Sequence, residues 1–146
     1  MQENPTVWLF DLDNTLHDAD AGIFTLINRA MTGYIAQRLR LSDQAASDLR
    51  QEYWHRYGAT LAGLQIHHPE IDIAEFLRES HPINEILTRL HGMPETKNTL
   101  SRLKGRKAVF SNGPSFYVSA VSDALGLTES FDALFGTDDF GLLYKP

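Results

Sequence analysis

Residues 7–18 have the sequence VWLFDLDNTLHD, and this segment contains the strongest indication of the architecture. Val7–Phe10 is a continuous apolar run that leads directly into two aspartates, Asp11 and Asp13, separated by a single residue. A short apolar run bounded by polar residues predicts a strand buried on both faces, the kind found in parallel sheets. Carboxylates at the end of such a strand are costly to desolvate, which favours a functional reason for their presence.

The segment after this strand, from residue 17 to about residue 92, is predicted to be helical throughout. Apolar residues recur at every fourth position, the period of a helix that faces a core, at Ile23, Ile27, Met31, Ile35 and Leu39. Four helices are predicted, which begin after the capping residue Asp20, at Ser42, after Asp72 with Glu75, and at Ile83. The helix that begins after Asp72 is predicted to end at His81–Pro82. No strand pattern interrupts this segment.

Helices and strands alternate again after Gly92. The pattern predicts a helix from Pro94 to Lys104–Gly105, a strand over 107–111, a helix over 115–125 ended by Gly126, and a strand over 131–137. This order predicts an α/β fold, with a Rossmann-like parallel-sheet core and an inserted helical module. We expect the core to comprise residues 1–16 and 93–146, and the helical insert residues 17–92.

The composition narrows the class of protein. The chain has 146 residues, of which 42% are hydrophobic and 22% charged, as in one ordinary globular domain. A net charge of −6 without any basic run argues against nucleic-acid binding. The absence of cysteine excludes disulfides and thiolate chemistry. The sequence has neither a membrane-spanning apolar stretch nor a signal-peptide pattern in MQENPTVW (1–8), so we expect a cytoplasmic protein.

Three sets of polar residues stand where the predicted strands end. Asp11 and Asp13 come after the first strand, Ser111–Asn112–Gly113 after the second, and Lys145 a few residues after the third. Sites in parallel α/β sheets lie outside the carboxyl ends of the strands, so we expect these residues to converge. Each set alone is also typical of an ordinary turn or of an exposed lysine. Their occurrence at three strand ends together favours a site.

This combination of residues suits phosphoryl chemistry. One carboxylate can attack phosphorus to give an aspartyl phosphate, and a second can protonate a leaving oxygen and later deprotonate a water. Two unit charges about 4 Å apart repel by roughly 4 kcal/mol at an effective dielectric of about 20, so a phosphate beside two aspartates needs a cation. Oxygen ligands point to Mg²⁺. Lys145 adds a positive charge, and the Ser111 hydroxyl with the backbone N–H groups of Asn112–Gly113 would hold phosphate oxygens.

The motifs resemble those of the haloacid dehalogenase-like (HAD) phosphatases. FDLDNTL (10–16) is similar to the first motif of that family, DxDxT, while VFSNG (109–113) resembles the second and the lysine of YKP (144–146) the third. The helical insert resembles the C1 cap of the family. Within the superfamily, the insert is most similar to the pyrimidine 5′-nucleotidase group, through YWHRYGATLAGL (53–64), HHPEID (67–72) and PINEIL (82–87).

The resemblance implies a role for each matching residue. Asp11 would be the nucleophile and a Mg²⁺ ligand, and Asp13 the acid/base and a ligand through its backbone carbonyl. Ser111, Asn112 and Lys145 would bind the phosphate. The cap would close over the site and exclude water. The implied reaction is the hydrolysis of a phosphate monoester, with a pyrimidine nucleotide as the substrate.

The cap residues that would read the substrate lie in the middle of the insert. We expect them to be Tyr57, Thr60, Gly63 and Leu64. Tyr57 and Leu64 also fall on an apolar stripe, so an alternative is that they belong to the core of the cap. His67 and His68 suggest a transition-metal site, but adjacent histidines beside a proline are more often simply exposed.

The sequence departs from the family pattern at its C-terminus. The fourth motif is an acidic pair after a further strand that completes Mg²⁺ binding, and no such pair follows Lys145. Asp138–Asp139 precede this lysine and fit better as loop residues. The chain therefore resembles the first two-thirds of a phosphatase, either truncated or naturally shortened. Loss of a strand would expose an apolar sheet edge, so we expect lower stability or self-association through that edge.

Three alternatives remain at this point. Another HAD phosphatase, acting on a sugar phosphate or phosphoglycolate, would differ mainly in its cap. A receiver-like signalling domain also combines an aspartate, a Ser/Thr and a Lys-Pro. Such a domain needs a phosphoacceptor after a middle strand, and the corresponding region here, around DLRQEYWHRYG (48–58), is predicted to be helical. A truncated chain that binds phosphate without turnover is the third alternative.

Overall fold

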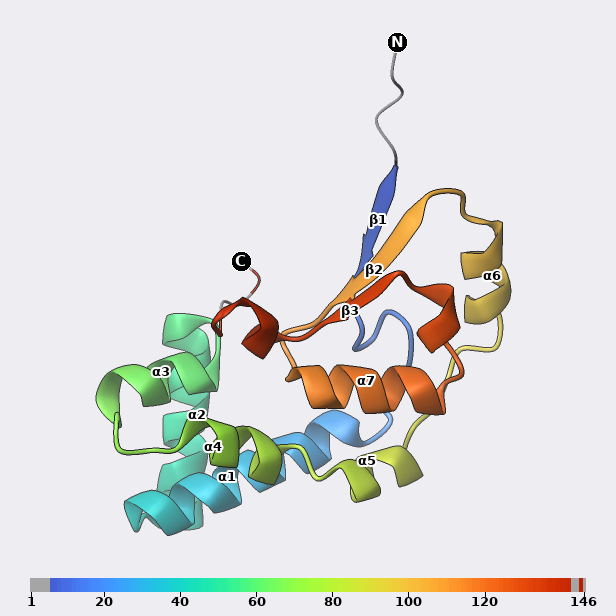
Figure 1. Cartoon of the computed structure of the whole chain (residues 1–146). Helices are drawn as coiled ribbons and strands as arrows, with labels where there is room; N and C mark the ends of the chain where they lie inside the picture. The colour runs from blue at the N-terminus through green and yellow to red at the C-terminus, as the bar shows by residue number, and fades with distance from the viewer. Residues whose placement is uncertain (1–5, 143–144, 146) are drawn as a thin grey trace. The chain divides into compact units, whose positions relative to one another are not determined.

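The computed structural model describes residues 6–142 and Lys145. Its elements, in chain order, are β1 (Val7–Phe10), α1 (Ile23–Leu39), α2 (Asp43–Tyr57), α3 (Thr60–His67), α4 (Ile73–Ser80), α5 (Ile83–Thr88), α6 (Thr96–Arg102), β2 (Arg106–Phe110), α7 (Ser115–Ala124), η1 (Thr128–Ser130), β3 (Ala133–Phe135) and η2 (Thr137–Phe140), as drawn in Figure 1. The predictions that involve residues 1–5, Leu143, Tyr144 and Pro146 fall outside the described residues.

The three strands form one parallel sheet in the order β1-β2-β3 (Figure 1). Phe10 at the end of β1 pairs with Val109, and Val109 in turn pairs with Leu134 of β3. The carboxyl ends of all three strands therefore reach the same edge of the sheet. The prediction of an α/β fold with a Rossmann-like parallel core is confirmed.

The prediction that β1 is buried on both faces is wrong. Val7, Trp8 and Leu9 are 61%, 40% and 65% exposed. Among the described residues, β1 is an edge strand that pairs only with β2, so its side chains have few neighbours. The apolar run correctly predicts a strand. The burial of that strand depends on the elements that pack against it, and the run itself gives no information about them.

The sheet and helix α7 share a hydrophobic core, which lies between them. Val109 of β2 is fully buried, as are three residues on one stripe of α7, at Tyr117, Val118 and Val121. Helix α7 packs along β3 (Figure 1). Gly136 follows β3 at a point where a Cβ atom would lie 2.2 Å from the backbone nitrogen of Ser115, so only glycine permits this close approach. The approach fixes the first turn of α7 beside the strand ends.

The helical segment has a core of its own. Helix α1 packs against α2 and α4, and α2 against α3 (Figure 1). Ser42 caps α2 by accepting a hydrogen bond from the Ala45 N–H, and Asp72 caps α4 by accepting one from the Glu75 N–H. Both caps match the predicted helix starts. The apolar repeat of α1 places Ile23, Ile27 and Ile35 in the interior, as the helical period predicts.

Two features of this segment differ from the predictions. Helix α1 begins at Ile23, directly after Gly22, so Asp20 is not its capping residue. Asp20 instead uses its backbone N–H to bond the Asn14 side-chain oxygen at 3.2 Å. Helix α3 was not predicted as a separate helix, because Ala59 gives it no side-chain cap that would mark its start.

The chain divides into two compact units. One runs up to Gly22 and resumes at Leu87, and it contains the sheet with α6 and α7. The other is the helical unit Ile23–Ile86. None of the helices in the described part of the chain is long and apolar enough to cross a membrane.

Candidate active site

Asp11 and Lys145 meet at the carboxyl edge of the sheet. Asp11 directly follows β1, and its Oδ1 forms an ion pair with the Lys145 ammonium. The Lys145 Nζ also lies 5.8 Å from the centroid of the Phe110 ring, at the end of β2. The Asp11 side chain is 44% exposed. Asp11 is therefore a charged, accessible carboxylate with a fixed cation beside it.

Asp13 lies in a different environment from Asp11. Its Oδ1 accepts a hydrogen bond from the Tyr117 hydroxyl at 2.5 Å and a second from His17 Nε2 at 2.8 Å. We assign the donor role to Nε2 because an ionised carboxylate only accepts. The Asp13 side chain is only 20% exposed. The two aspartates of the first motif thus have different partners: a lysine for Asp11, and a phenol and an imidazole for Asp13.

His17 is held in place by the backbone around it. It forms an antiparallel bridge with Gly92, and the N–H of the next residue, Asp18, donates to the His91 carbonyl at 2.9 Å. The imidazole is fully buried. Its Nδ1 atom has no hydrogen-bond partner among the described residues. The imidazole ring is thus held in place, and its Nε2 atom forms a hydrogen bond with Asp13.

Tyr117 reaches Asp13 from the first turn of α7. Its ring packs against Gly113, where a Cβ atom would lie 2.7 Å from Tyr117 Cδ1, so a larger residue at position 113 would displace the ring. Burial raises the pKa of the Tyr117 phenol, and the nearby charge of Asp13, the hydrogen bond to Asp13 and the charge of Asp11 raise it further. The hydroxyl therefore stays protonated and acts as a donor to Asp13.

The turn after β2 joins the strand ends to Lys145. Ser111 is buried, its N–H donates to the Phe135 carbonyl at the end of β3, and its Oγ accepts from the Gly113 N–H at 3.0 Å. The Asn112 side-chain oxygen accepts from the backbone N–H of Lys145 at 2.8 Å. Asn112 thus fastens the backbone that carries the lysine. The Gly113 N–H, predicted as a phosphate donor, is engaged within the turn.

Asp138 accepts hydrogen bonds at the start of α7, and Asp139 accepts one at the start of η2. Asp138 accepts hydrogen bonds from the backbone N–H and the hydroxyl of Ser115, at 2.6 and 2.7 Å. Burial raises the pKa of Asp138, but these hydrogen bonds outweigh it and leave the pKa below its usual value. Asp139 accepts from the Gly136 N–H at 2.8 Å. Both carboxylates are therefore engaged by the backbone, and they lie in the 3-10 helix η2 and not in the loop that was predicted.

A family model described as "haloacid dehalogenase-like hydrolase" matches residues 6–146. The chain belongs to the haloacid dehalogenase-like hydrolases. Among curated proteins, Phosphate metabolism protein 8 of Saccharomyces cerevisiae is 25% identical over 136 residues. The alignment covers 88% of this chain and 42% of the yeast protein.

Solved structures of HAD proteins share the fold. The HAD phosphatase from Thermococcus onnurineus has a TM-score of 0.59 and 19% identity, over 94% of this chain and 64% of that one. The putative HAD-hydrolase YfnB from Bacillus subtilis, a structure with bound magnesium, has a TM-score of 0.53 and 16% identity, over 95% and 66% of the two chains. The chain thus spans less than two thirds of the length of these relatives.

The residues of this HAD chain suit a magnesium ion. The described residues contain no group of three or more His, Asp or Glu residues able to hold a metal. Magnesium, however, is commonly bound by only one or two carboxylates together with waters and substrate phosphate. Asp11 offers an accessible carboxylate at the strand edge, and only Lys145 among the described residues pairs with it. The donor set is therefore consistent with the cofactor typical of the family.

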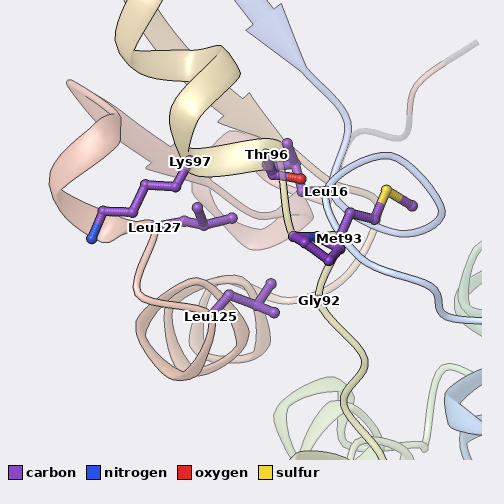
Figure 2. Close-up of a pocket in the computed structure, with 8 residues that line it drawn as sticks. Leu16, Gly92, Met93, Thr96, Lys97, Leu125 and Leu127 are labelled. Carbon is purple, nitrogen blue, oxygen red and sulfur yellow. The ribbon is translucent and has the colours of Figure 1, made fainter.

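A pocket of about 340 Å³ lies on the same unit but is not lined by these carboxylates. Its lining residues are mostly apolar, with one lysine at the rim (Figure 2): Leu16, Gly92, Met93, Pro94, Thr96, Lys97, Leu125 and Leu127. None of the predicted site residues is among them. The pocket therefore belongs to the surface beside α6 and the end of α7, and not to the candidate active site.

The four residues predicted to read the substrate lie in the helical unit. Thr60, Gly63 and Leu64 are buried in α3, where the Thr60 hydroxyl donates to the Arg50 carbonyl at 3.0 Å. The Tyr57 hydroxyl lies 2.6 Å from His67 Nε2, at the end of α2. The rings of His67 and Tyr53 stack with centroids 5.3 Å apart. Their role in specificity stays a prediction.

His17 and Tyr117 contact Asp13 but belong to no motif that is recognisable in the sequence. His17 lies four residues after Asp13, a spacing that brings two side chains together in a helix but has no fixed meaning in a loop. Tyr117 lies 104 residues after Asp13, and no local pattern links the two. The one sequence feature that could have pointed to Tyr117 is its position in the first turn of the helix that follows the second motif.

Proposed function

We propose that this HAD chain belongs to a Mg²⁺-dependent phosphate monoester hydrolase that acts through an aspartyl phosphate on Asp11. The observation that carries the proposal is the Asp11–Lys145 ion pair at the carboxyl edge of the sheet. Ser111 is buried at the end of the neighbouring strand β2. An accessible carboxylate next to a fixed cation suits attack on an anionic phosphate, because the cation offsets the repulsion between the two negative groups.

The first step transfers the phosphoryl group to the enzyme. An oxygen of Asp11 attacks phosphorus, and the bond from phosphorus to the leaving oxygen breaks. Lys145 occupies Oδ1 of Asp11, and no described residue donates to Oδ2, so Oδ2 is the oxygen left to attack. Asp13, in its protonated form, gives its proton to the leaving oxygen, and the alcohol departs.

The second step releases the phosphate. Asp13, now ionised, removes a proton from a water molecule, and the water oxygen attacks phosphorus. The bond between phosphorus and Asp11 breaks, which restores the Asp11 carboxylate and leaves Asp13 protonated for the next cycle. Lys145 and the Ser111 hydroxyl hold the phosphate oxygens, since the Ser111 Oγ accepts from Gly113 and keeps its hydrogen to donate.

Asp11 and the backbone carbonyl of Asp13 are the groups that we propose to hold Mg²⁺. When bound, the ion neutralises charge on the transferring phosphoryl group. A chelator that removes Mg²⁺ should therefore abolish turnover, and added Mg²⁺ should restore it. Turnover that persists unchanged in excess chelator would contradict this part of the proposal.

A pyrimidine nucleotide is the proposed substrate, and the helical insert, residues 17–92, is proposed as the cap that recognises it. Support comes from the sequence resemblance of this segment to the nucleotidase group, around Tyr57, Thr60, Gly63 and Leu64. The deciding assay measures phosphate release with Mg²⁺ from UMP and CMP against a sugar phosphate and phosphoglycolate. Preference for UMP and CMP supports the proposal. Equal or better turnover of the other esters would replace it with a phosphatase of another small ester, and absence of all turnover would support a binding-only chain.

A further inference from the structure

We propose that His17 and Tyr117 are positioning residues that hold Asp13 by its Oδ1 atom, so that its other oxygen, Oδ2, exchanges the proton with the leaving group. This inference rests on the proposed phosphate monoester hydrolysis and adds two residues to it. Both residues lie in the same unit as Asp13.

The basis is that two donors converge on one oxygen of the carboxyl group. The Tyr117 hydroxyl and His17 Nε2 both contact Asp13 Oδ1, at 2.5 and 2.8 Å. A proton on Oδ1 would face these two donor hydrogens, so the acid form of Asp13 carries its proton on Oδ2. No described residue donates to Oδ2. The Asp13 side chain is 20% exposed, so the carboxyl group is not sealed from a substrate.

Both donors are rigid, which makes them suited to orient a third group. Tyr117 and His17 are each fully buried. The Tyr117 ring has Gly113 against it, and His17 is held by the bridge to Gly92. The Asp13 carboxyl group cannot rotate without breaking two hydrogen bonds to side chains that cannot follow it. A group held in this way stays near the geometry that proton transfer requires.

The buried Nδ1 atom of His17 supports a functional reason for the contact. It has no hydrogen-bond partner among the described residues, although nearly all buried polar atoms in proteins have one. An apolar residue at position 17 would fill the same space without leaving such an atom. The imidazole is explained by its other nitrogen, which bonds Asp13.

Orientation of Asp13 matters most when the leaving oxygen needs its proton. 4-Nitrophenyl phosphate releases a stable phenolate that leaves without protonation, whereas benzyl phosphate must leave as an alcohol. The specificity constant kcat/KM covers the steps up to departure of this group. The ratio of kcat/KM for the two esters therefore reports how well Asp13 donates its proton, separately from effects on phosphate binding.

The experiment compares this ratio in the unmodified protein and in Tyr117→Phe, which removes one hydroxyl and keeps the ring. We expect kcat/KM for benzyl phosphate to fall about 10- to 100-fold, as for a weakened general acid, and that for 4-nitrophenyl phosphate less than about 3-fold. His17→Met should act in the same direction, and His17→Gln, whose amide can donate from a similar position, should recover part of the loss.

Two further variants serve as controls. Tyr34→Phe removes a hydroxyl from another buried tyrosine, one that donates to Glu75 Oε2 at 2.8 Å in the helical unit, and it should leave the ratio unchanged. Asp13→Asn should show the same leaving-group dependence as Tyr117→Phe. Because Tyr117 acts through Asp13, adding Tyr117→Phe to Asp13→Asn should cause no further loss.

The outcomes separate this inference from the function on which it rests. If the unmodified protein hydrolyses neither ester, the proposed function fails, and the positioning role fails with it. If it hydrolyses both, an equal loss for the two esters in Tyr117→Phe and His17→Met, or no loss at all, overturns the positioning role and leaves the hydrolysis intact. A full additional loss in the double variant would also overturn it.

Discussion

The Lys145 ammonium forms an ion pair with Asp11 Oδ1, although 134 positions separate the two residues in the chain. The parallel sheet makes this contact, because Asp11 follows β1 and Lys145 is fastened through Asn112 to the turn after β2. Asp11 thereby differs from Asp13, whose partners are His17 and Tyr117. The two carboxylates of one motif therefore lie in different environments, which supports the proposed roles of Asp11 as nucleophile and Asp13 as acid/base.

Lys145→Ala should weaken phosphate binding. The variant removes a charge-assisted contact, so the Kd for inorganic phosphate in the presence of Mg²⁺ should rise about 10- to 100-fold. Isothermal titration calorimetry measures this directly. Lys97→Ala is the matched control, because Lys97 lines the separate pocket on the same unit. An unchanged Kd for Lys145→Ala would remove this lysine from the site.

Asp11→Asn should abolish turnover and leave the fold intact. The amide is a poor nucleophile, and Asn is close to Asp in size, so phosphate release should fall by at least about 10³-fold while the circular dichroism spectrum stays the same. The Lys145 ammonium would lose its ionic partner. Phosphate binding should therefore persist without the repulsion from Asp11. Turnover retained in this variant would exclude Asp11 as the nucleophile.

Asp138 should stabilise the fold in its ionised form only. Its pKa is lower in the folded protein than its usual value, so its contribution is present above about pH 4 and is lost as the pH falls through the folded-state pKa. Asp138→Ala removes the cap on Ser115 and should cost about 1 kcal/mol of unfolding free energy at pH 7.

The matched control for this prediction is Asp123→Asn, which changes an exposed aspartate near the end of the same helix. Urea unfolding of each protein at pH 7 and at pH 3 gives its free energy of unfolding at the two pH values. The difference between Asp138→Ala and the unmodified protein should shrink at pH 3. A difference that stays constant between the two pH values would show that the charge of Asp138 plays no part.

Gly63→Ala should destabilise the helical unit. A Cβ atom at this position would lie 2.3 Å from Cγ of the Tyr53 ring, which is buried between α2 and α3. The clash should cost about 1–3 kcal/mol, as for other overpacked sites. Gly33→Ala is the control, because nothing lies within 4 Å of its Cβ and alanine should stabilise helix α1 by up to about 1 kcal/mol. Thermal melting of the two variants should shift in opposite directions.

The exposed apolar face of β1 should promote self-association. Val7 and Leu9 are 61% and 65% exposed on a strand that forms the edge of the described sheet. An edge of this kind offers unpaired backbone groups beside apolar surface. Sedimentation velocity of the chain should show a larger species that grows with concentration, and Leu9→Lys should reduce it. A single monomeric species at all concentrations would contradict this expectation.

The sequence predicted the features that are encoded locally. Ser42, Asp72 and Gly126 each act within a few residues of their own position, so the helix ends that they mark agree with the structure. The order of strands and helices followed from the apolar periods. The strand-end rule for parallel sheets predicted that Asp11 and Lys145 would lie close together, and the two form an ion pair.

Features that depend on distant neighbours were not predictable in this way. The exposure of β1 depends on which strands flank it, and the apolar run alone carries no such information. The hydrogen bond from Tyr117 to Asp13 joins residues 104 positions apart, and it is decided by how α7 lies against the sheet. His17 was missed because the loop that places its imidazole on Asp13 has no sequence signature.

The most direct test of the central claim is to trap the phosphorylated enzyme. The purified protein is mixed with Mg²⁺ and a phosphate monoester and quenched in acid. Borohydride then reduces any aspartyl phosphate to homoserine, and the position is read by peptide mass spectrometry. If Asp11 is the nucleophile, homoserine should form at position 11 and nowhere else, and none should form when substrate is omitted. Release of phosphate from the ester while Asp11 remains unmodified in every quenched sample would contradict this assignment.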